Sequence, residues 1–130
     1  MSEKARDELR LRLLDADFSV CKTAGEPKMN PNAAFCFTAR TDEEHSLVCQ
    51  TDDVPAETIE REDGWKAFRV QGTLEFSLIG ILAGIAGVLA ENKIGIFVIS
   101  TFNTDYVLVK RENLQRAVRA LQDAGYVFEK

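Results

Sequence analysis

The sequence has few of the residues that metal sites and disulfide scaffolds require. Its 130 residues include one histidine and three cysteines, Cys21, Cys36 and Cys49, which lie far apart and form no CxxC pair. A structural zinc site needs closely spaced cysteine and histidine ligands, and a disulfide scaffold usually has an even number of cysteines. We therefore expect reduced thiols in strands, no metal site and no cofactor.

Long apolar runs and a signal peptide are also missing. The longest apolar run, residues 78–90, has 13 residues, whereas a membrane-spanning helix needs about 20. The first ten residues are charged and lack the apolar stretch of a signal peptide. We expect a cytoplasmic protein that does not associate with a membrane.

Basic residues are scarce in one long stretch. Residues 42–63 contain nine acidic residues and a single base, Arg61, and the whole chain has a formal net charge of −5. Such a stretch repels phosphate backbones. Nucleic acid is therefore not an expected partner.

The second half of the chain alternates strand and helix patterns. Apolar and polar residues alternate over 65–71, which predicts a strand. Apolar residues then follow a helical spacing from Ile81 to residue 90, and residues 94–99 form a nearly continuous apolar run that is typical of a buried strand. After a polar turn, residues 106–110 predict a second strand that pairs with it as a hairpin.

A second amphipathic helix completes this pattern. Residues 114–122 repeat apolar positions at a helical spacing, and Gly125 stands where a left-handed C-cap is favoured. Residues 126–128 predict a short final strand. The order βαββαβ predicts an α+β, ferredoxin-like fold, with two helices on one face of an antiparallel sheet.

The first half of the chain echoes this pattern in a reduced form. Residues 20–33 contain two prolines and a glycine, so we expect a loop in place of a first helix. We expect strands at residues 9–13, 16–20, 35–39 and 46–50, and a short helix at residues 55–62. We therefore predict two tandem units: residues 1–63, which are abbreviated, and residues 64–130, which are regular.

Two segments could together hold a small zwitterion. The first amides of a helix that begins near Gly80 lack intrahelical acceptors and suit a carboxylate, and Ser77 could cap that helix. The turn at residues 100–104 ends at Asp105, whose charge could hold an ammonium or guanidinium group. In a βαββ unit, both segments border the first strand, so we expect opposite charges on either side of a gap the size of an amino acid.

Each of these features also has a purely structural interpretation. Gly80, Gly84 and Gly87 could serve only close packing of the helix, and Asn103 and Asp105 are common turn residues that bond their own backbone. His45 could form a nucleophilic pair with Cys36 or Cys49. No third group is evident to orient such a pair, so we do not expect an enzyme.

Residues 65–128 resemble the ACT domain family of small-molecule regulatory modules. The resemblance rests on the strand that ends at Gly72, the helix entry at Gly80 and Ile81, and the segments AENKIGIFVIST and TDYVLVK. Within this family, the closer resemblance is to stand-alone bacterial ACT proteins, and it rests on the run GILAGIAGVLAENKIGIFVISTFNTDYVLV. These proteins are related to the CASTOR arginine sensors and to the regulatory half of aspartate kinases. That subgroup pairs a degenerate first unit with a regular second one.

The resemblance implies a regulatory sensor, tuned by a free amino acid or a similar metabolite, with no catalytic activity of its own. It implies binding at the junction of two ACT units, with Asp105 facing a cationic ligand, and a homodimer that acts on a separate enzyme. The implied ligand-binding residues are Ser77, Leu78, Ile79, Gly80, Ile81, Thr101, Phe102, Asn103, Thr104 and Asp105. The alternative is a structural or protein–protein interaction module with a vestigial pocket.

Overall fold

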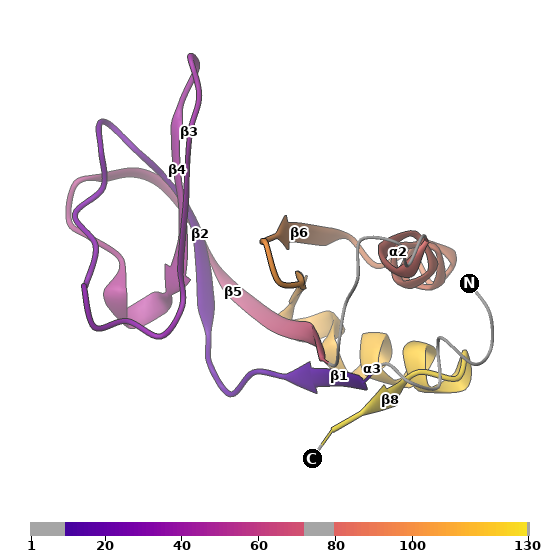
Figure 1. The fold of residues 1–130 in the computed structure, drawn as a ribbon. Coiled ribbons are helices and arrows are strands. Elements are labelled where there is room, and N and C mark those ends of the chain that lie inside the picture. Colours follow the sequence, from indigo (N-terminus) through magenta and orange to yellow (C-terminus); the bar gives the residue numbers. More distant parts are fainter. Residues whose placement is uncertain (1–9, 72–79, 130) are drawn as a thin grey trace. The chain divides into compact units, whose positions relative to one another are not determined.

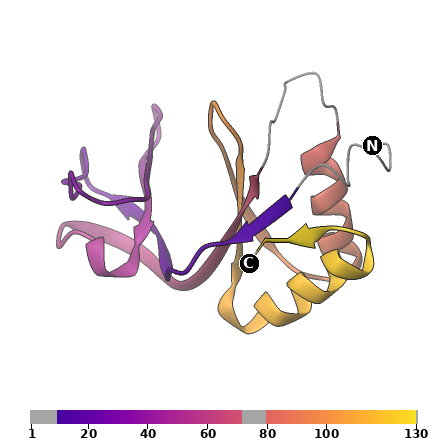
Figure 2. The same ribbon diagram turned by 60° about the horizontal axis from the view of Figure 1, so that its bottom comes forward.

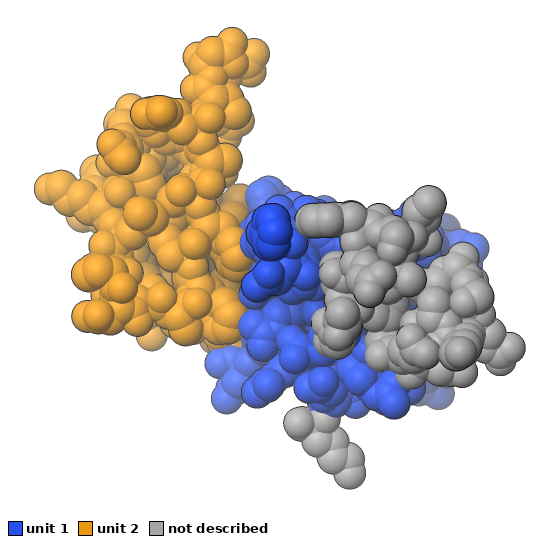
Figure 3. Space-filling view, in the orientation of Figure 1, with its two compact units in different colours: residues 1–15, 66–130 blue, residues 16–65 orange. Residues whose placement is uncertain are grey.

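The computed structural model describes residues 10–71 and 80–129 (Figure 1). The chain forms two compact units, coloured separately in Figure 3. Unit 1 combines residues 1–15 with residues 66–130, and unit 2 comprises residues 16–65. One long strand, β5 (Thr58–Gln71), contributes its first part to unit 2 and its second part to unit 1.

Unit 1 consists of a mixed sheet and two helices (Figure 2). Its strand order among the described residues is β6-β7-β5-β1-β8, in which β1 is antiparallel to β5 and parallel to β8. The elements that accompany β5 are β1 (Arg10–Leu13), α2 (Ile81–Glu91), β6 (Ile96–Ser100), β7 (Asp105–Lys110), the 3-10 turn η2 (Arg111–Asn113), α3 (Leu114–Asp123) and β8 (Val127–Phe128).

A single apolar core lies between the helices and one face of this sheet. Alternate residues of β5, Phe68 and Val70, are buried in the same cluster as Ile85 of α2 and Leu121 of α3. The two helices also contact each other. Because strand side chains alternate between faces, both helices therefore cover the same face of the sheet.

The elements predicted for the second half of the chain are confirmed. Both predicted helices are present as α2 and α3, and the predicted strands at 94–99, 106–110 and 126–128 correspond to β6, β7 and β8. Gly125 has a φ of 100°, and its N–H donates to the carbonyl of Gln122 at 3.0 Å, as a left-handed C-cap requires. The α+β fold class is thus confirmed, and the arrangement is consistent with a ferredoxin-like unit.

β1 adds a strand that the βαββαβ order of residues 64–130 does not supply. In the ferredoxin-like arrangement the last strand lies beside the first, yet here β1 lies between β5 and β8. Leu11 points its side chain into the core of unit 1 and is 1% exposed. Its carbonyl accepts a hydrogen bond of 2.7 Å from the N–H of Glu129. The strand that the pattern of residues 9–13 predicts thus belongs to this sheet, and the division of the chain at residue 63 remains a prediction.

Unit 2 is a smaller antiparallel sheet. Its strand order is β3-β4-β2-β5, formed by β2 (Phe18–Thr23), β3 (Cys36–Arg40), β4 (His45–Gln50) and the first part of β5. A short 3-10 turn, η1 (Thr51–Asp53), follows β4. Residues 24–35 contain no helix, as their prolines and glycine predicted.

The helix predicted at residues 55–62 is wrong. The hydroxyl of Thr58 donates to the carbonyl of Pro55 at 2.7 Å, and β5 begins at Thr58 itself. From there to Trp65 the strand pairs with β2 in reverse direction, from Thr23 back to Phe18. Pairing with a neighbouring strand supplies the backbone partners that a short helix would have found locally, so tertiary context overrides local propensity.

Within residues 10–71 and 80–129, no helix has the length and apolar character needed to cross a membrane.

Candidate functional site

The turn between β6 and β7 is closed by its own threonines. The N–H of Thr101 donates to the carbonyl of Thr104 at 2.8 Å, and the hydroxyl of Thr101 donates to the same carbonyl at 3.0 Å. In return, the N–H of Thr104 donates to the Thr101 hydroxyl at 3.3 Å. Phe102 and Asn103 are left at the tip, where the Phe102 side chain is 85% exposed.

A side-chain hydrogen bond ties this turn to the end of β5. The hydroxyl of Thr104 donates to the carbonyl of Val70 at 2.7 Å, one residue before β5 ends at Gln71. Thr101–Asp105 therefore lie at the edge of the sheet where β5 ends, next to the strand that the sequence predicts at residues 65–71.

Asp105 opens β7 opposite Ser100 of β6. Its side chain is partly buried. With the residues that the structure describes, the carboxylate makes no hydrogen bond and no ion pair. Both of its oxygens can therefore accept hydrogen bonds from a cationic group supplied by a ligand.

An arginine that the sequence analysis did not single out lies beside this turn. Arg69 Nη1 donates to the hydroxyl of Tyr106 at 3.4 Å, and the guanidinium lies 5.8 Å from the centre of the Tyr106 ring. Arg69 Nε also donates to the side-chain oxygen of Gln71. These contacts hold the end of β5 against the start of β7. The alternation of apolar and polar residues in WKAFRVQ could have pointed to Arg69, because it places this side chain on the face of the strand opposite Phe68.

The start of α2 has the properties expected of an anion-binding helix end. Gly80 precedes the helix with a φ of 85°, a conformation that favours glycine. The first intrahelical bond runs from the N–H of Gly84 to the carbonyl of Gly80 at 2.8 Å, so the amides of Ile81, Leu82 and Ala83 have no acceptor within the helix. The Ile81 side chain is buried in the core, so only its main chain could contact a ligand.

Three of the predicted site residues, Ser77, Leu78 and Ile79, lie outside the described residues. The structure gathers Thr101, Phe102, Asn103, Thr104 and Asp105 in one turn at the end of β5. The opposition of the Gly80 and Ile81 amides to the Asp105 carboxylate remains a prediction.

The three glycines of the α2 region differ in what surrounds them. A Cβ at Gly84 would lie 2.8 Å from the hydroxyl oxygen of Tyr126, whereas a Cβ at Gly80 or Gly87 would meet nothing within 4 Å. The packing interpretation therefore fits Gly84. At Gly80 the requirement for glycine comes from the backbone conformation.

The Cys–His alternative finds no support in the geometry of unit 2. Cys36 and Cys49 are direct partners across β3 and β4, whereas His45 pairs with Arg40 at the other end of β4. His45 and Cys49 are four residue steps apart along β4, a distance of about 13 Å. Burial raises the pKa of the Cys49 thiol to about 12, which works against a nucleophilic thiolate.

Metal coordination is equally unsupported. Among residues 10–71 and 80–129, no group of three or more His, Cys, Asp or Glu side chains is arranged to hold a metal ion.

Comparison with known sequences identifies a family. The ACT domain family model matches residues 60–123. The human protein named cytosolic arginine sensor for mTORC1 subunit 1 is 41% identical over 59 residues, which are 45% of this chain and 18% of that protein. The bovine protein of the same name matches equally. The chain thus spans about a fifth of the length of these curated relatives.

Comparison with solved structures extends the similarity over nearly the whole chain. A crystal structure of a protein from Agrobacterium tumefaciens is 30% identical, with a TM-score of 0.83 over 94% of this chain and 92% of that one. The ligand-free regulatory subunit of aspartate kinase from Thermus thermophilus has a TM-score of 0.62, with 14% identity over 92% of this chain and 97% of that one. At that identity the second similarity shows the fold alone.

Proposed function

We propose, since the chain belongs to the ACT domain family, that it is a sensor that binds a free amino acid and has no catalytic activity of its own. ACT domains generally bind amino acids and serve in regulation. The proposal extends this general property to one site of unit 1. The single observation that carries it is the Thr104–Val70 hydrogen bond of 2.7 Å, which holds the β6–β7 turn at the end of β5.

Two groups of residues have distinct roles in this proposal. The amides at Gly80 and Ile81, together with Ser77, Leu78 and Ile79, hold the α-carboxylate, because an uncapped helix start attracts an anion. Main-chain groups of Thr101, Phe102, Asn103 and Thr104 shape the other side of the site, and Asp105 holds a cationic group of the ligand.

Arginine is the first ligand to test. The name of the human relative describes it as an arginine sensor. Arginine carries a carboxylate for the helix amides and a guanidinium for Asp105, and the planar guanidinium can donate two parallel hydrogen bonds to one carboxylate. Any other amino acid that binds at the same residues would support the same function with a different specificity.

The wider organisation is part of the proposal. The chain comprises two ACT-like units, residues 1–63 and 64–130, and acts in the cytoplasm as a homodimer on a separate enzyme. Binding of the ligand would shift the population between two conformations, and the enzyme would respond to one of them.

A second candidate is an interaction module that binds no small molecule. The polar groups of the turn favour it, because the amide and hydroxyl of Thr101 are already paired with Thr104. In that case the exposed Phe102 would contact a protein partner, and Asp105 would have no ligand.

Isothermal titration calorimetry distinguishes the two candidates. We expect arginine or another free amino acid to bind the purified chain. Asp105→Asn should raise the Kd by at least about ten-fold, since a hydrogen bond to a charged group contributes about 1.5–3 kcal/mol. Glu91→Gln is the matched control, because Glu91 is an exposed acid at the opposite end of α2, and its Kd should equal that of the wild type. Absence of both binding heat and a melting-temperature shift for all twenty amino acids would exclude the sensor.

A further inference from the structure

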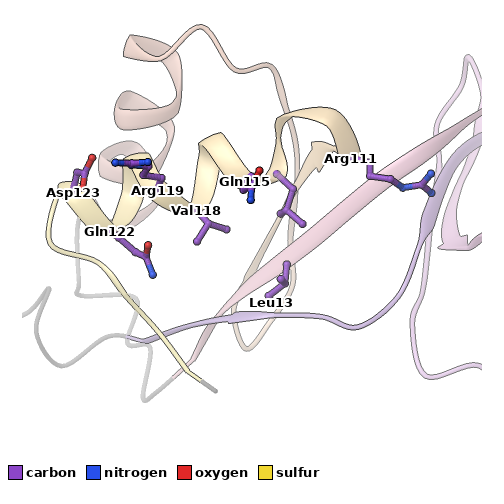
Figure 4. Close-up of a pocket in the computed structure, with 8 residues that line it drawn as sticks. Leu13, Arg111, Gln115, Val118, Arg119, Gln122 and Asp123 are labelled. Atoms are coloured by element: carbon purple, nitrogen blue, oxygen red, sulfur yellow. The ribbon is translucent and has the colours of Figure 1, made fainter.

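A groove with apolar and charged lining residues runs along α3 in unit 1. It lies between the end of β1 and α3, has a volume of about 890 Å³, and is lined on its apolar side by Leu13, Leu114 and Val118. Figure 4 shows Leu13 and Val118 pointing into the space between the strand and the helix. Helix α3 uses Ala117 and Leu121 for the core, and Leu13 remains 41% exposed. Leu114 also packs against the core of unit 1, so the apolar surface that the groove presents comes mainly from Leu13 and Val118.

The charged side chains around the groove are mainly basic. Arg111 lies at one end (Figure 4), and Arg119 and Asp123 belong to the last turns of α3. Two arginines against one aspartate give the rim a positive balance. An apolar segment flanked by carboxylates is the chemistry that complements such a rim.

Unit 2 carries a segment with that chemistry. Ile59 of β5 is 57% exposed, and the exposed acids Glu57 and Glu60 stand close to it in the sequence. The two units also differ in their overall charge. The sequence of unit 2 has eleven acidic and four basic residues, and that of unit 1 has ten acidic and twelve basic residues.

We propose that the α3 groove binds the Ile59 segment of a second copy of this chain. This proposal deepens the homodimer named in the proposed function by assigning the surfaces through which the copies meet. Ile59 packs against Leu13, Leu114 and Val118, which removes apolar surface of both copies from water. Glu57 and Glu60 face Arg111 and Arg119, and this pairing of opposite charges fixes the register of the contact.

The contact joins two different surfaces. If each copy offers both its groove and its Ile59 segment to the same partner, a closed dimer with two equivalent contacts results. If the second contact is made with a third copy, the chain forms longer assemblies. Both cases predict association that depends on protein concentration and weakens as salt screens the charges.

Analytical ultracentrifugation of the full chain and its variants tests the proposal. The wild type should associate as its concentration rises. Ile59→Ser should raise the Kd of association by at least about ten-fold, the effect of losing a central anchor worth more than 1.4 kcal/mol. Arg119→Glu should also weaken association, because it places like charges opposite each other at the rim of the groove. Combining Arg119→Glu with Glu60→Arg should restore part of the affinity, because the opposite charges then meet again in exchanged positions.

Two variants serve as matched controls. Met29→Ser removes another exposed apolar side chain of unit 2, which is 48% exposed. Arg12→Glu reverses an exposed charge on β1, at a position that alternates with Leu11 and Leu13 and therefore lies on the other face of the sheet. Both should associate like the wild type, and circular dichroism should show that all variants fold.

A chain that stays monomeric at every concentration would overturn the proposal. So would association that Ile59→Ser and Arg119→Glu leave unchanged, or a groove that captures a different protein while the copies remain apart. Calorimetry with amino acids tests the proposed ligand binding separately from the association of copies. Ile59→Ser leaves the Asp105 turn intact, so ligand binding in that variant is measured independently of association.

Discussion

At the scale of single residues, burial determines the chemistry of the three cysteines in unit 2. Cys21 and Cys49 are buried together with Leu47, and Cys36 packs against them. Desolvation raises the pKa of all three thiols, and for Cys49, which is 2% exposed, it raises the pKa from the ordinary value of 9.0 to about 12. A thiol that resists ionisation is a packing residue at neutral pH.

The Cys49 thiol predicts how stability depends on pH in alkaline solution. Below pH 9 the thiol is protonated in both the folded and the unfolded chain, so it contributes no pH dependence. Between pH 9 and 12 the unfolded chain releases this proton and the folded chain retains it, so the free energy of unfolding falls as the pH rises. Urea denaturation across this range should show a shallower fall in Cys49→Ala than in the wild type, and equal slopes would contradict the assignment.

Single residues also show where sequence reasoning about the site stops. Asp105 could be identified from its place after a polar turn, and Gly80 from its place before an apolar helix. The hydrogen bond from Thr104 to Val70 could not be predicted from the sequence, because it depends on which strand adjoins the turn in space. The same holds for the contact between Arg69 and Tyr106, which are 37 residues apart in the chain.

At the scale of elements, helix α2 combines a closely packed glycine with an exposed one. Gly84 faces the buried Tyr126, whose hydroxyl oxygen would lie 2.8 Å from an added Cβ, whereas Gly87 is exposed and has nothing within 4 Å. The two positions lie one turn apart on the same helix. Substitutions at these two positions therefore distinguish the effect of packing on stability from the effect of helix propensity.

Alanine at these two positions should have opposite effects on stability. Gly87→Ala should raise the free energy of unfolding by up to about 1 kcal/mol, the difference in helix propensity between the two residues. Gly84→Ala gains the same propensity but forces Tyr126 or the helix to move, so we expect a net loss of about 1–2 kcal/mol. Urea denaturation measures both values. An equal gain in the two variants would show that α2 does not pack closely on Tyr126.

The elements of unit 1 were more predictable than those of unit 2 for a physical reason. Helices α2 and α3 bury one face each, so their apolar residues recur at a period that can be read locally. The first part of β5 is exposed over residues 59–63 and is held in place by pairing with β2, and local sequence does not reveal that pairing. The insertion of β1 between β5 and β8 likewise depends on contacts between distant parts of the chain.

At the scale of the whole molecule, residues 60–123 match the ACT domain family, and the chain divides its charge unevenly between two units. The proposed ligand site and the α3 groove both belong to unit 1, but they involve different elements: the β6–β7 turn and the start of α2 for the ligand, and α3 with β1 for the second copy. Binding of a ligand and association of copies can therefore be measured separately.

Amide chemical shifts test the proposed amino-acid site most directly. In two-dimensional ¹⁵N–¹H NMR spectra of the full chain, titration with arginine, and then with each of the other amino acids, should move the resonances of Gly80, Ile81 and residues 101–105 in a saturable way for at least one ligand. The resonances of β3 and β4 should stay in place. Spectra that remain unchanged with every amino acid, or that change only within residues 16–65, would contradict a site at the Asp105 turn.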